Sequence, residues 1–381
     1  MTQPASVSDW RIRAKRRLPR MFFDYIDGGS YAETTLARNV GDMERVALRQ
    51  RVLTDVSKLD LSTEIFGQKL AMPILLAPVG MAGLYARRGE VQAARAADAA
   101  GLPFCLSTVS ICSIEEVSAA IGKPLWFQLY MIKDRGFMSA VLERAKAAGS
   151  PVLIFTVDLP VPGARYRDVR SGLSGELSFL DKLRRAVDGA CHPFWLWDVM
   201  LNGGPATFGN LASAMPNAKG TNDFAMWLGR NFDPSVSWRD LEWVRERWDG
   251  PIVIKGILDA EDARHAVEAG ASGIVVSNHG GRQLDGVPST VEALPPIVEA
   301  VGDRATVLMD GGVRSGLDVL KALALGARSV MIGRAWAYAL AGGGEAGVRA
   351  MLTTLQRELE VAMALTGCTD IRKAGRDLLV R

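Results

Sequence analysis

Residues 306–334 read TVLMDGGVRSGLDVLKALALGARSVMIGR and contain the repeating unit of the predicted fold. The apolar runs Thr306–Asp310 and Ser329–Ile332 are too short for helices, and each is followed by glycine, a pattern typical of buried strands. The residues between the two runs have a helical pattern. A strand, a helix and a second strand in this order predict two parallel strands joined by a crossover helix.

Apolar runs of the same kind recur along the chain, and helical patterns separate most of them. The eight runs are Met72–Ala77, Phe104–Ser107, Trp126–Leu129, Val152–Asp158, Ile252–Lys255, Gly273–Ser277, Thr306–Asp310 and Ser329–Ile332. Nearly continuous apolar strands that alternate with helices are typical of a parallel sheet covered on its outer face. We therefore predict an α/β fold, a (β/α)8 TIM barrel, with an N-terminal helical segment and a long insertion after strand 4.

The spacing of the runs predicts the domain organisation. Val152 and Ile252, which begin the fourth and fifth runs, are 252 − 152 = 100 residues apart, far more than one strand–helix unit needs. Connections of this length are usually functional. The prediction is one domain over residues 1–381, with an N-terminal segment at 1–70, the barrel at 71–340, the insertion at 160–250 and a C-terminal helix at 341–381.

Composition excludes several classes of protein. The chain has 48% hydrophobic and 23% charged residues, so it can bury a large core and is neither disordered nor fibrous. A formal net charge of +3 over 381 residues predicts no nucleic-acid partner. The four cysteines lack C-x-x-C spacing, which favours reduced thiols and a cytoplasmic location. No apolar stretch of signal-peptide or membrane-spanning length is expected.

Polar residues or glycines follow every apolar run. Barrel enzymes place their chemistry at the C-terminal ends of the strands, whereas an open sheet concentrates its ligands at one switch point. Because the polar residues are distributed over all the run ends, they favour a closed barrel. Besides Pro78–Gly80, they are Ser107, Gln128, Tyr130, Asp158, Lys255, Ser277, His279, Asp310, Gly311, Gly312, Gly333 and Arg334.

Two glycine-containing loops predict a phosphate site. Asp310-Gly311-Gly312-Val313-Arg314 follows the seventh run, and Gly333-Arg334 follows the eighth. Glycine lets backbone N–H groups approach an anion, and a helix N-terminus adds partial positive charge. Phosphate sites after strands 7 and 8 recur in barrels. The alternative interpretation is that these glycines only cap turns.

His279 is the predicted general base, because it is the one histidine of three at a run end, beside two glycines and Arg282. Imidazole titrates near neutral pH, and a guanidinium fits a carboxylate through two hydrogen bonds. Arg165, at the start of the insertion, offers a second cation, and Asp158 would orient the imidazole. A base with two arginines predicts proton abstraction from a small anionic hydroxy acid.

Lys255 has two interpretations. Its ammonium could stabilise negative charge on a reduced cofactor ring, or it could form a structural ion pair with Asp158 or Asp310. No G-x-G-x-x-G motif follows an early run, so nicotinamide binding is not supported. Three scattered histidines and four scattered cysteines predict no metal site.

Residues 277–285, S-N-H-G-G-R-Q-L-D, resemble the signature of the FMN-dependent L-2-hydroxy acid oxidase and dehydrogenase family. The resemblance extends over essentially the whole chain. Within the family it is strongest to the bacterial respiratory enzymes that dehydrogenate L-lactate, through Tyr85–Glu90, Pro162–Asp168 and Asn231–Pro234. It implies FMN as the cofactor and oxidation of L-lactate to pyruvate, with hydride and carbanion routes both open.

The resemblance also implies a role for each candidate residue. The implied catalytic residues are His279, Asp158 and Tyr130, and the implied substrate-binding residues are Tyr25, Tyr130, Arg165 and Arg282. The residues implied to bind FMN are Ser107, Gln128, Thr156, Lys255, Ser277, Asp310, Gly311, Gly312, Arg314, Gly333 and Arg334.

The expected partners are a quinone as electron acceptor and further copies of the chain in a homo-oligomer. The aromatic residues of His192–Trp197 suit a membrane interface, which predicts peripheral attachment to the cytoplasmic side of the inner membrane. The alternative is that these tryptophans pack on the barrel or in an oligomer interface. Two other functions stay open: an O2-reducing L-2-hydroxy acid oxidase, and a phosphate-binding barrel isomerase or lyase without redox chemistry.

Overall fold

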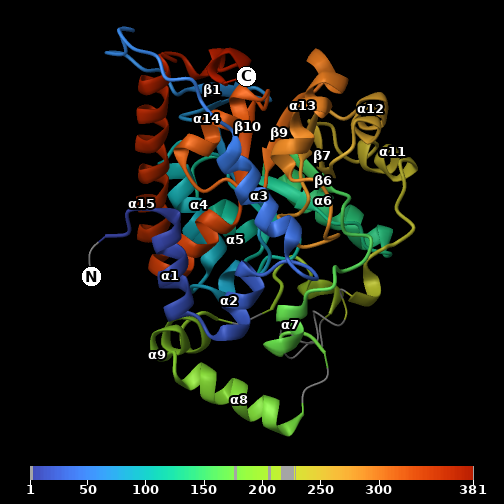
Figure 1. Ribbon diagram of the computed structural model, residues 1–381. Coiled ribbons are helices and arrows are strands. Elements are labelled where there is room, and N and C mark those ends of the chain that lie inside the picture. The colour runs from blue at the N-terminus through green and yellow to red at the C-terminus, as the bar shows by residue number, and fades with distance from the viewer. Residues whose placement is uncertain (1–2, 176–177, 205–206, 216–226, 228, 381) are drawn as a thin grey trace.

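Eight parallel strands form one sheet in the computed structural model, which describes residues 3–175, 178–204, 207–215, 227 and 229–380 (Figure 1). Their order is β3-β10-β9-β8-β7-β6-β5-β4, and an isolated parallel bridge between Leu76 and Phe104 joins the two ends. The predicted (β/α)8 barrel is confirmed, with one strand at each predicted run. The strands are β3 (Ile74–Leu76), β4 (Cys105–Ser107), β5 (Trp126–Leu129), β6 (Leu153–Thr156), β7 (Ile252–Ile257), β8 (Gly273–Val276), β9 (Thr306–Asp310) and β10 (Ser329–Ile332).

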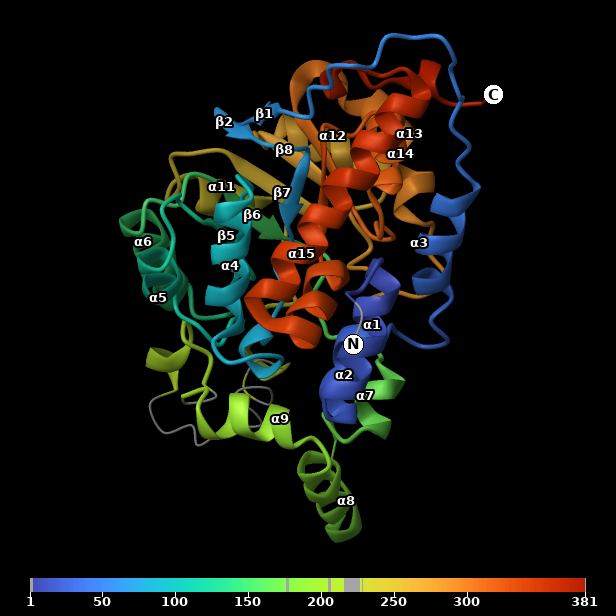
Figure 2. The same cartoon turned by 90° about the vertical axis from the view of Figure 1, so that its left-hand side faces the viewer.

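Helices cover the outer face of the barrel (Figures 1 and 2). Several begin at a side-chain cap, as where Ser315 accepts a hydrogen bond from the backbone N–H of Asp318 at the start of α14. The helices are α4 (Gly89–Ala99), α5 (Ile114–Ala119), α6 (Arg135–Ala147), α11 (Arg239–Arg245), α12 (Ala260–Glu268), α13 (Thr290–Val301), α14 (Gly316–Ala324) and α15 (Arg334–Thr366), with the 3-10 turns η1 (Ala82–Leu84) and η4 (Gly302–Arg304).

The barrel interior follows the two-residue period of a strand, in which successive side chains point to opposite faces. One apolar layer comprises Leu75, Cys105, Trp126, Ile154, Val253, Val275, Leu308 and Met331. Their neighbours in sequence belong to the larger core between the strands and the helices. Two residues further along each strand, the inward positions are Ala77, Ser107, Gln128, Thr156, Lys255, Ser277, Asp310 and Gly333. Most candidate cofactor residues therefore form the layer directly above the apolar one.

A hairpin that the sequence analysis did not predict closes the N-terminal end of the barrel. β1 (Thr63–Ile65) pairs in antiparallel fashion with β2 (Gln68–Leu70). The ring of Phe66, at the turn, lies 5.8 Å from the ring of Trp126. A side chain at Gly273 would come within 2.7 Å of Phe66, so the hairpin requires glycine there. The hairpin therefore covers the end of the barrel opposite the C-terminal strand ends that carry the candidate site residues.

The first and last helices contact each other outside the barrel (Figure 2). The chain begins with α1 (Val7–Arg17), α2 (Arg20–Asp27) and α3 (Thr34–Arg45). α15 begins at Arg334, directly after β10, is interrupted at Gly344 and ends at Thr366, so the helix expected at 341–381 corresponds to its second segment. Only Gly333 separates β10 from this helix, and no side-chain cap marks the start of the helix. The 3-10 turns η5 (Ile371–Lys373) and η6 (Arg376–Leu378) complete the chain.

The insertion after β6 forms short helices that leave the barrel. They are α7 (Tyr166–Arg170), α8 (Phe179–Ala190), α9 (Pro193–Trp195), the π-helical turn η2 (Leu196–Leu201) and the 3-10 turn η3 (Ala212–Ala214). No residue of α8 is buried, and α8 stands clear of the barrel in both views (Figures 1 and 2). Parts of the predicted N-terminal segment, insertion and C-terminal segment lie outside the described residues, namely 1–2, 176–177, 205–206, 216–226, 228 and 381.

The tryptophans of the insertion do not share one environment. Trp195 and Trp248 are buried, whereas Trp197 is 67% exposed. Trp195 also donates a hydrogen bond to the carbonyl of Leu84 at 2.8 Å. In the part of the chain that the structure describes, no helix has both the length and the apolarity that crossing a bilayer requires.

Candidate active site

A cavity of about 500 Å³ lies at the C-terminal ends of the strands. Most of the predicted site residues line it: Tyr25, Tyr130, Thr156, Arg165, Lys255, His279, Arg282, Asp310, Gly311, Gly312, Arg314, Gly333 and Arg334. The other four predicted residues, Ser107, Gln128, Asp158 and Ser277, lie behind the cavity wall and hydrogen-bond to one another or to lining residues. Strand ends that are far apart in the sequence therefore converge on one space.

His279 is held from both sides of its ring. Its Nδ1 lies 2.8 Å from Oδ1 of Asp158, and its Nε2 lies 3.3 Å from the hydroxyl of Tyr130. The backbone of His279 has φ of 57°, in the left-handed region, and its N–H donates to Oγ of Ser277 at 3.1 Å. The hydrogen bond to Asp158 places a proton on Nδ1, so Nε2 presents its lone pair to the cavity.

The charges around His279 favour a neutral imidazole. Burial lowers the pKa of His279, and the positive charges of Lys255 and Arg165 act in the same direction, which together outweigh the attraction of Asp158. Burial pushes the pKa of Asp158 upward, but the hydrogen bond with His279 and the charge of Lys255 lower it overall. The pair is therefore a carboxylate and a neutral imidazole, which can accept a proton.

Two arginines lie over one tyrosine ring. The guanidinium carbon of Arg282 is 4.5 Å from the ring centroid of Tyr25, and that of Arg165 is 6.0 Å from it. Arg282 donates to the backbone carbonyls of Tyr25 and Gly28, and Nε of Arg165 donates to the carbonyl of Arg282 at 3.1 Å. Nη2 of Arg165 also donates to Oε1 of Gln283 at 3.2 Å. Both arginines line the cavity, and a planar guanidinium suits a bound carboxylate.

Lys255 combines features of both predicted interpretations. Its Nζ lies 2.9 Å from Oδ2 of Asp310, the structural ion pair, and donates to Oγ of Ser277 at 2.9 Å. Its side chain also lines the cavity. Burial lowers the pKa of Lys255, but the charges of Asp310 and Asp158 outweigh burial and raise it. The group is therefore a buried ammonium ion at the cavity wall.

Several buried polar atoms near the cavity lack a partner among the residues that the structure describes. Nε2 of Gln128, Oγ1 of Thr156 and Oδ1 of Asp310 are buried and make no hydrogen bond. Gln128 is fixed through its other end, because Oγ of Ser107 donates to its Oε1 at 3.0 Å. Unpaired buried polar atoms are costly. Three of them at one level of the barrel are typical of a site that a polar ligand completes.

Glycine has a different role in each of the two loops, the one after β9 and the one after β10. A side chain at Gly312 would come within 2.1 Å of the carbonyl of Asn39, and one at Gly311 within 2.9 Å of Thr290, so packing alone demands glycine there. A side chain at Gly333 would meet nothing closer than 3.9 Å, because Gly333 faces the cavity. Gly333 caps α15, whose N-terminus therefore points toward the cavity and favours an anion.

The side chains of the predicted phosphate arginines are partly engaged by the protein. Arg334 donates to the carbonyls of Ile26, Gly28 and Gly280 at 2.8–2.9 Å. Burial lowers its pKa to about 9. Arg314 donates to the carbonyl of Val313 at 2.9 Å. The guanidinium of Arg334 thus joins the N-terminal segment to the loop after β8, while its backbone N–H belongs to the start of α15.

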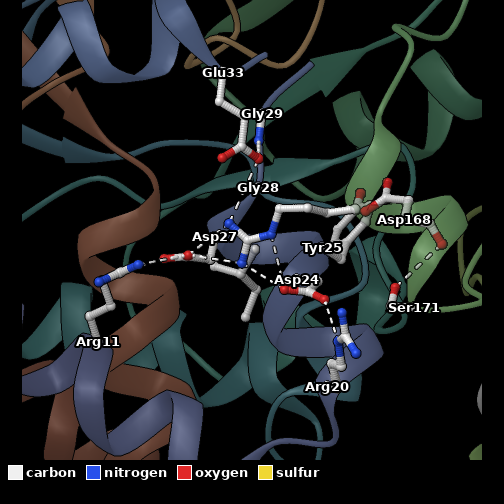
Figure 3. A network of polar contacts seen from close by, with 12 residues as sticks. Arg11, Arg20, Asp24, Tyr25, Asp27, Gly28, Gly29, Glu33, Asp168 and Ser171 are labelled. Atoms are coloured by element: carbon white, nitrogen blue, oxygen red, sulfur yellow. Dashed lines mark hydrogen bonds and ion pairs between the residues drawn. The ribbon is translucent and has the colours of Figure 1, made fainter. Parts of the chain in front are cut away.

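An ion-pair network that the sequence analysis missed joins the insertion to the N-terminal segment (Figure 3). Arg167 of α7 lies 2.6 Å from Asp24 and 3.0 Å from Asp27, both on α2. Arg167 follows Arg165 by two residues, and the two aspartates flank Tyr25. The network therefore fixes the two elements that carry the arginine and the tyrosine of the cavity. The sequence signal for this network was the pair Asp24 and Asp27, which lie three residues apart and therefore on one face of a helix.

We predict that Asp27 makes the protein sensitive to acid. Burial raises the pKa of Asp27, but hydrogen bonds from Arg11 and Tyr338 outweigh it and lower the pKa from 3.8 to about 2. This difference corresponds to about 2 kcal/mol of stability, present above about pH 4 and lost as the pH falls toward 2. Urea unfolding of Asp27→Asn should show less of this acid dependence than the wild type. An unchanged pH dependence would contradict the assignment.

Comparison with known proteins places the chain among flavoenzymes. Residues 14–381 match the family model described as FMN-dependent dehydrogenase. The chain is 60% identical over 375 residues to the L-lactate dehydrogenase of Caulobacter vibrioides, covering 98% of this chain and 97% of that one. It is also 60% identical over 377 residues to the L-lactate dehydrogenase of Pseudomonas aeruginosa, covering 99% and 98%.

Solved structures have the same architecture. The monotopic membrane protein (S)-mandelate dehydrogenase superimposes with a TM-score of 0.93 at 36% identity, over 100% of both chains. Mandelate oxidase superimposes with a TM-score of 0.83 at 40% identity, over 99% of this chain and 98% of that one.

Proposed function

Because this chain belongs to the FMN-dependent dehydrogenase family, we propose that it oxidises L-lactate to pyruvate and passes the electrons to a quinone. The convergence of His279, Arg165 and Arg282 on one cavity carries the proposal for the chemistry. The 60% identity to L-lactate dehydrogenases over nearly the whole chain supports the substrate. A non-redox isomerase or lyase is no longer supported, because its chemistry does not require the family's cofactor.

The residues around the cavity fit FMN. The edge of a flavin ring carries hydrogen-bond donors and acceptors, and Gln128, Thr156 and Lys255 offer matching groups, two of them with unpaired atoms. The free Oδ1 of Asp310 suits a ribityl hydroxyl. The open face of Gly333 at the N-terminus of α15 suits the phosphate. We propose that these residues, with Ser107, Ser277, Gly311, Gly312, Arg314 and Arg334, hold the cofactor.

The substrate would bind through its carboxylate. We propose that Arg165 and Arg282 hold the carboxylate and that the hydroxyl of Tyr25 adds a hydrogen bond. The two guanidiniums already lie over the Tyr25 ring, so little reorganisation is needed when the carboxylate enters. This anchoring would place the hydroxyl-bearing carbon beside His279 and Tyr130.

His279 would act as the base. Its Nε2 would take the proton of the lactate hydroxyl, while Asp158 stabilises the imidazolium that forms. Tyr130, whose pKa burial raises, stays protonated and can donate a hydrogen bond to the reacting oxygen. Lys255 would stabilise negative charge at the cofactor. FMN, when bound, supplies a two-electron acceptor for the substrate carbon.

Anaerobic reduction of the bound flavin tests the proposed substrate. The purified holoenzyme is mixed in a stopped-flow instrument with L-lactate, D-lactate, glycolate or L-mandelate, and flavin bleaching is followed. The proposal expects the highest kcat/KM for L-lactate and no bleaching by D-lactate. Preferred bleaching by L-mandelate would assign a different substrate, and a purified protein without flavin absorbance would reject the proposed chemistry altogether.

We predict that activity persists to mildly acidic pH. Because burial and nearby cations lower the pKa of His279 below its ordinary value of 6.5, the imidazole stays neutral through neutral pH. The acid limb of kcat/KM should therefore have its midpoint below pH 6.5. In Asp158→Asn, which removes a negative charge beside the ring, this limb should move to lower pH while kcat falls. A limb above pH 6.5 in the wild type would contradict a neutral resting base.

The electron acceptor separates a dehydrogenase from an oxidase of the same family. Reoxidation of the reduced holoenzyme should be fast with a soluble quinone analogue and slow with O2. The opposite order would identify an L-2-hydroxy acid oxidase. This measurement does not depend on which hydroxy acid reduces the flavin.

We propose that the chain contacts the cytoplasmic side of the inner membrane peripherally. The exposed apolar face of α8 supports the contact itself. Phe179 is 79% exposed, and Leu183 and Val187 follow it at intervals of four residues on one face of α8. Phe194 and Trp197 continue the exposed apolar surface. Such surfaces typically mark interaction sites.

A homo-oligomer of one-domain chains is also part of the proposal, and light scattering of the purified protein tests it.

We predict that Leu183→Ser with Val187→Ser abolishes most membrane binding. Full burial of one such side chain contributes about 1.5–3 kcal/mol, so two losses should weaken binding to lipid vesicles at least about tenfold. Leu365→Ser with Val361→Ser makes the same changes at similarly exposed positions on α15 and should bind normally. Equal binding of both double variants in vesicle sedimentation would argue against α8.

A further inference from the structure

A second cavity, of about 690 Å³, lies on the outside of the barrel. It is distinct from the active-site cavity and is lined from five parts of the chain: the end of α1, α4 with the two residues before it, α5, η2 and the middle of α15. Its charged lining residues are Arg17, Arg87, Arg88, Arg95, Glu116, Asp198 and Glu345. We call it the arginine cavity.

Two of the acidic residues are engaged by strong partners. Glu116 pairs with Arg88, and Glu345 lies 2.7 Å from Arg349, which is not a lining residue. The third acid, Asp198, is shared by two guanidiniums. Arg17 approaches it at 3.5 Å and Arg87 at 4.0 Å, both longer than charge-assisted hydrogen bonds of about 2.7–2.9 Å. Arg17 and Arg87 therefore retain donors for an anion.

The backbone adds positive potential to the arginine cavity. Gly344 has φ of 63° and interrupts α15, so a new helical segment begins beside the cavity. The backbone N–H of Glu345 donates to Oε1 of Gln92 at 2.8 Å, which caps this start. A helix N-terminus carries about half a positive charge. A cavity lined by guanidinium groups and the N-terminus of a helical segment has the groups that bind phosphate in proteins.

The position of the cavity points to the source of that phosphate. Asp198 belongs to η2, and its neighbour Trp197 is 67% exposed, as is Leu201 in the same turn. A surface with exposed apolar groups beside a basic cavity matches the interface of an anionic bilayer, where acyl chains and phosphate groups meet.

We propose that the arginine cavity binds the phosphate headgroup of an anionic phospholipid. This inference rests on the membrane contact proposed above and adds a lipid class to it. Arg17 and Arg87 would exchange their long contacts with Asp198 for bonds to the lipid phosphate. The headgroup would then fix the orientation of η2 and α8 on the bilayer.

A monomeric lipid separates a built site from general surface charge. The FMN-loaded full-length enzyme, whose barrel phosphate site is filled, is titrated calorimetrically with short-chain phosphatidylglycerol below its micelle concentration. Arg17→Gln with Arg87→Gln should weaken binding at least about tenfold, as expected for losing charge-assisted hydrogen bonds. Lys15→Gln with Arg16→Gln has the same charge change outside the cavity and should bind like the wild type. Asp198→Asn removes the competing carboxylate and should bind more tightly.

Three results would overturn the proposal. They are absence of binding to the wild type, equal weakening in the two double variants, and binding of inorganic phosphate as tight as that of the lipid, which would indicate a free-anion site. Sedimentation with phosphatidylcholine vesicles, with and without phosphatidylglycerol, tests membrane contact separately. If Leu183→Ser with Val187→Ser loses vesicle binding while the cavity variant keeps its preference for phosphatidylglycerol, the membrane contact stands and the arginine cavity does not.

Discussion

Replacing His279 with glutamine is expected to lower kcat for L-lactate by about 10²–10⁴-fold while FMN stays bound, because general-base catalysis contributes about that much. Glutamine keeps hydrogen-bonding capacity toward Asp158 and Tyr130 but cannot accept the hydroxyl proton at neutral pH. Among the residues proposed to bind FMN, His279 hydrogen-bonds to Ser277, and this bond is made by its backbone N–H, which glutamine keeps. Flavin content should therefore be unchanged.

Single-turnover flavin reduction measures this effect directly, without contributions from the electron acceptor. His265→Gln is the matched control, because His265 is exposed on α12 and should have no effect. Since the backbone of His279 has a positive φ, His279→Asn is a useful second variant, as asparagine tolerates this region well. If both variants reduced the flavin at rates near the wild type, another group would have to be the base.

Replacing Lys255 with methionine is expected to destabilise the protein by about 3–5 kcal/mol and to remove FMN. The change leaves Asp310 buried without its cation 2.9 Å away, and breaking a buried ion pair typically costs this much. It also removes the ammonium ion from the cavity wall. Thermal unfolding and the ratio of flavin to protein absorbance measure the two effects independently.

Lys321→Met is the matched control for this loss. Lys321 is also buried, but its Nζ donates to the carbonyl of Met43 at 2.9 Å and it is not among the residues that line the cavity. It should lose stability and retain flavin. Lys255→Met with Asp310→Asn removes both buried charges and should recover stability without recovering FMN affinity. Wild-type flavin affinity in Lys255→Met would refute a role for Lys255 at the cofactor.

The strand residues of the active site could be predicted from the chain alone. Thr156 and Lys255 follow inward apolar residues by two positions, and the same holds for Asp310. Because a strand alternates its faces with a period of two, local sequence decides which side chains enter the barrel. The parallel strands then bring their C-terminal ends to one opening, so the position of each run in the sequence is enough to place these residues.

The remainder depends on contacts between distant segments. The approach of Arg167 to Asp24, which fixes the insertion to α2, joins residues 143 apart in the chain, and the arginine cavity is assembled from five separate elements. Trp195 is buried and Trp197 is exposed, and the sequence around them does not predict this difference. Periodicity along a chain specifies which face of a helix or strand is apolar. It does not specify which charged side chains pair or which apolar face stays exposed, because these depend on where the packed barrel places the loops.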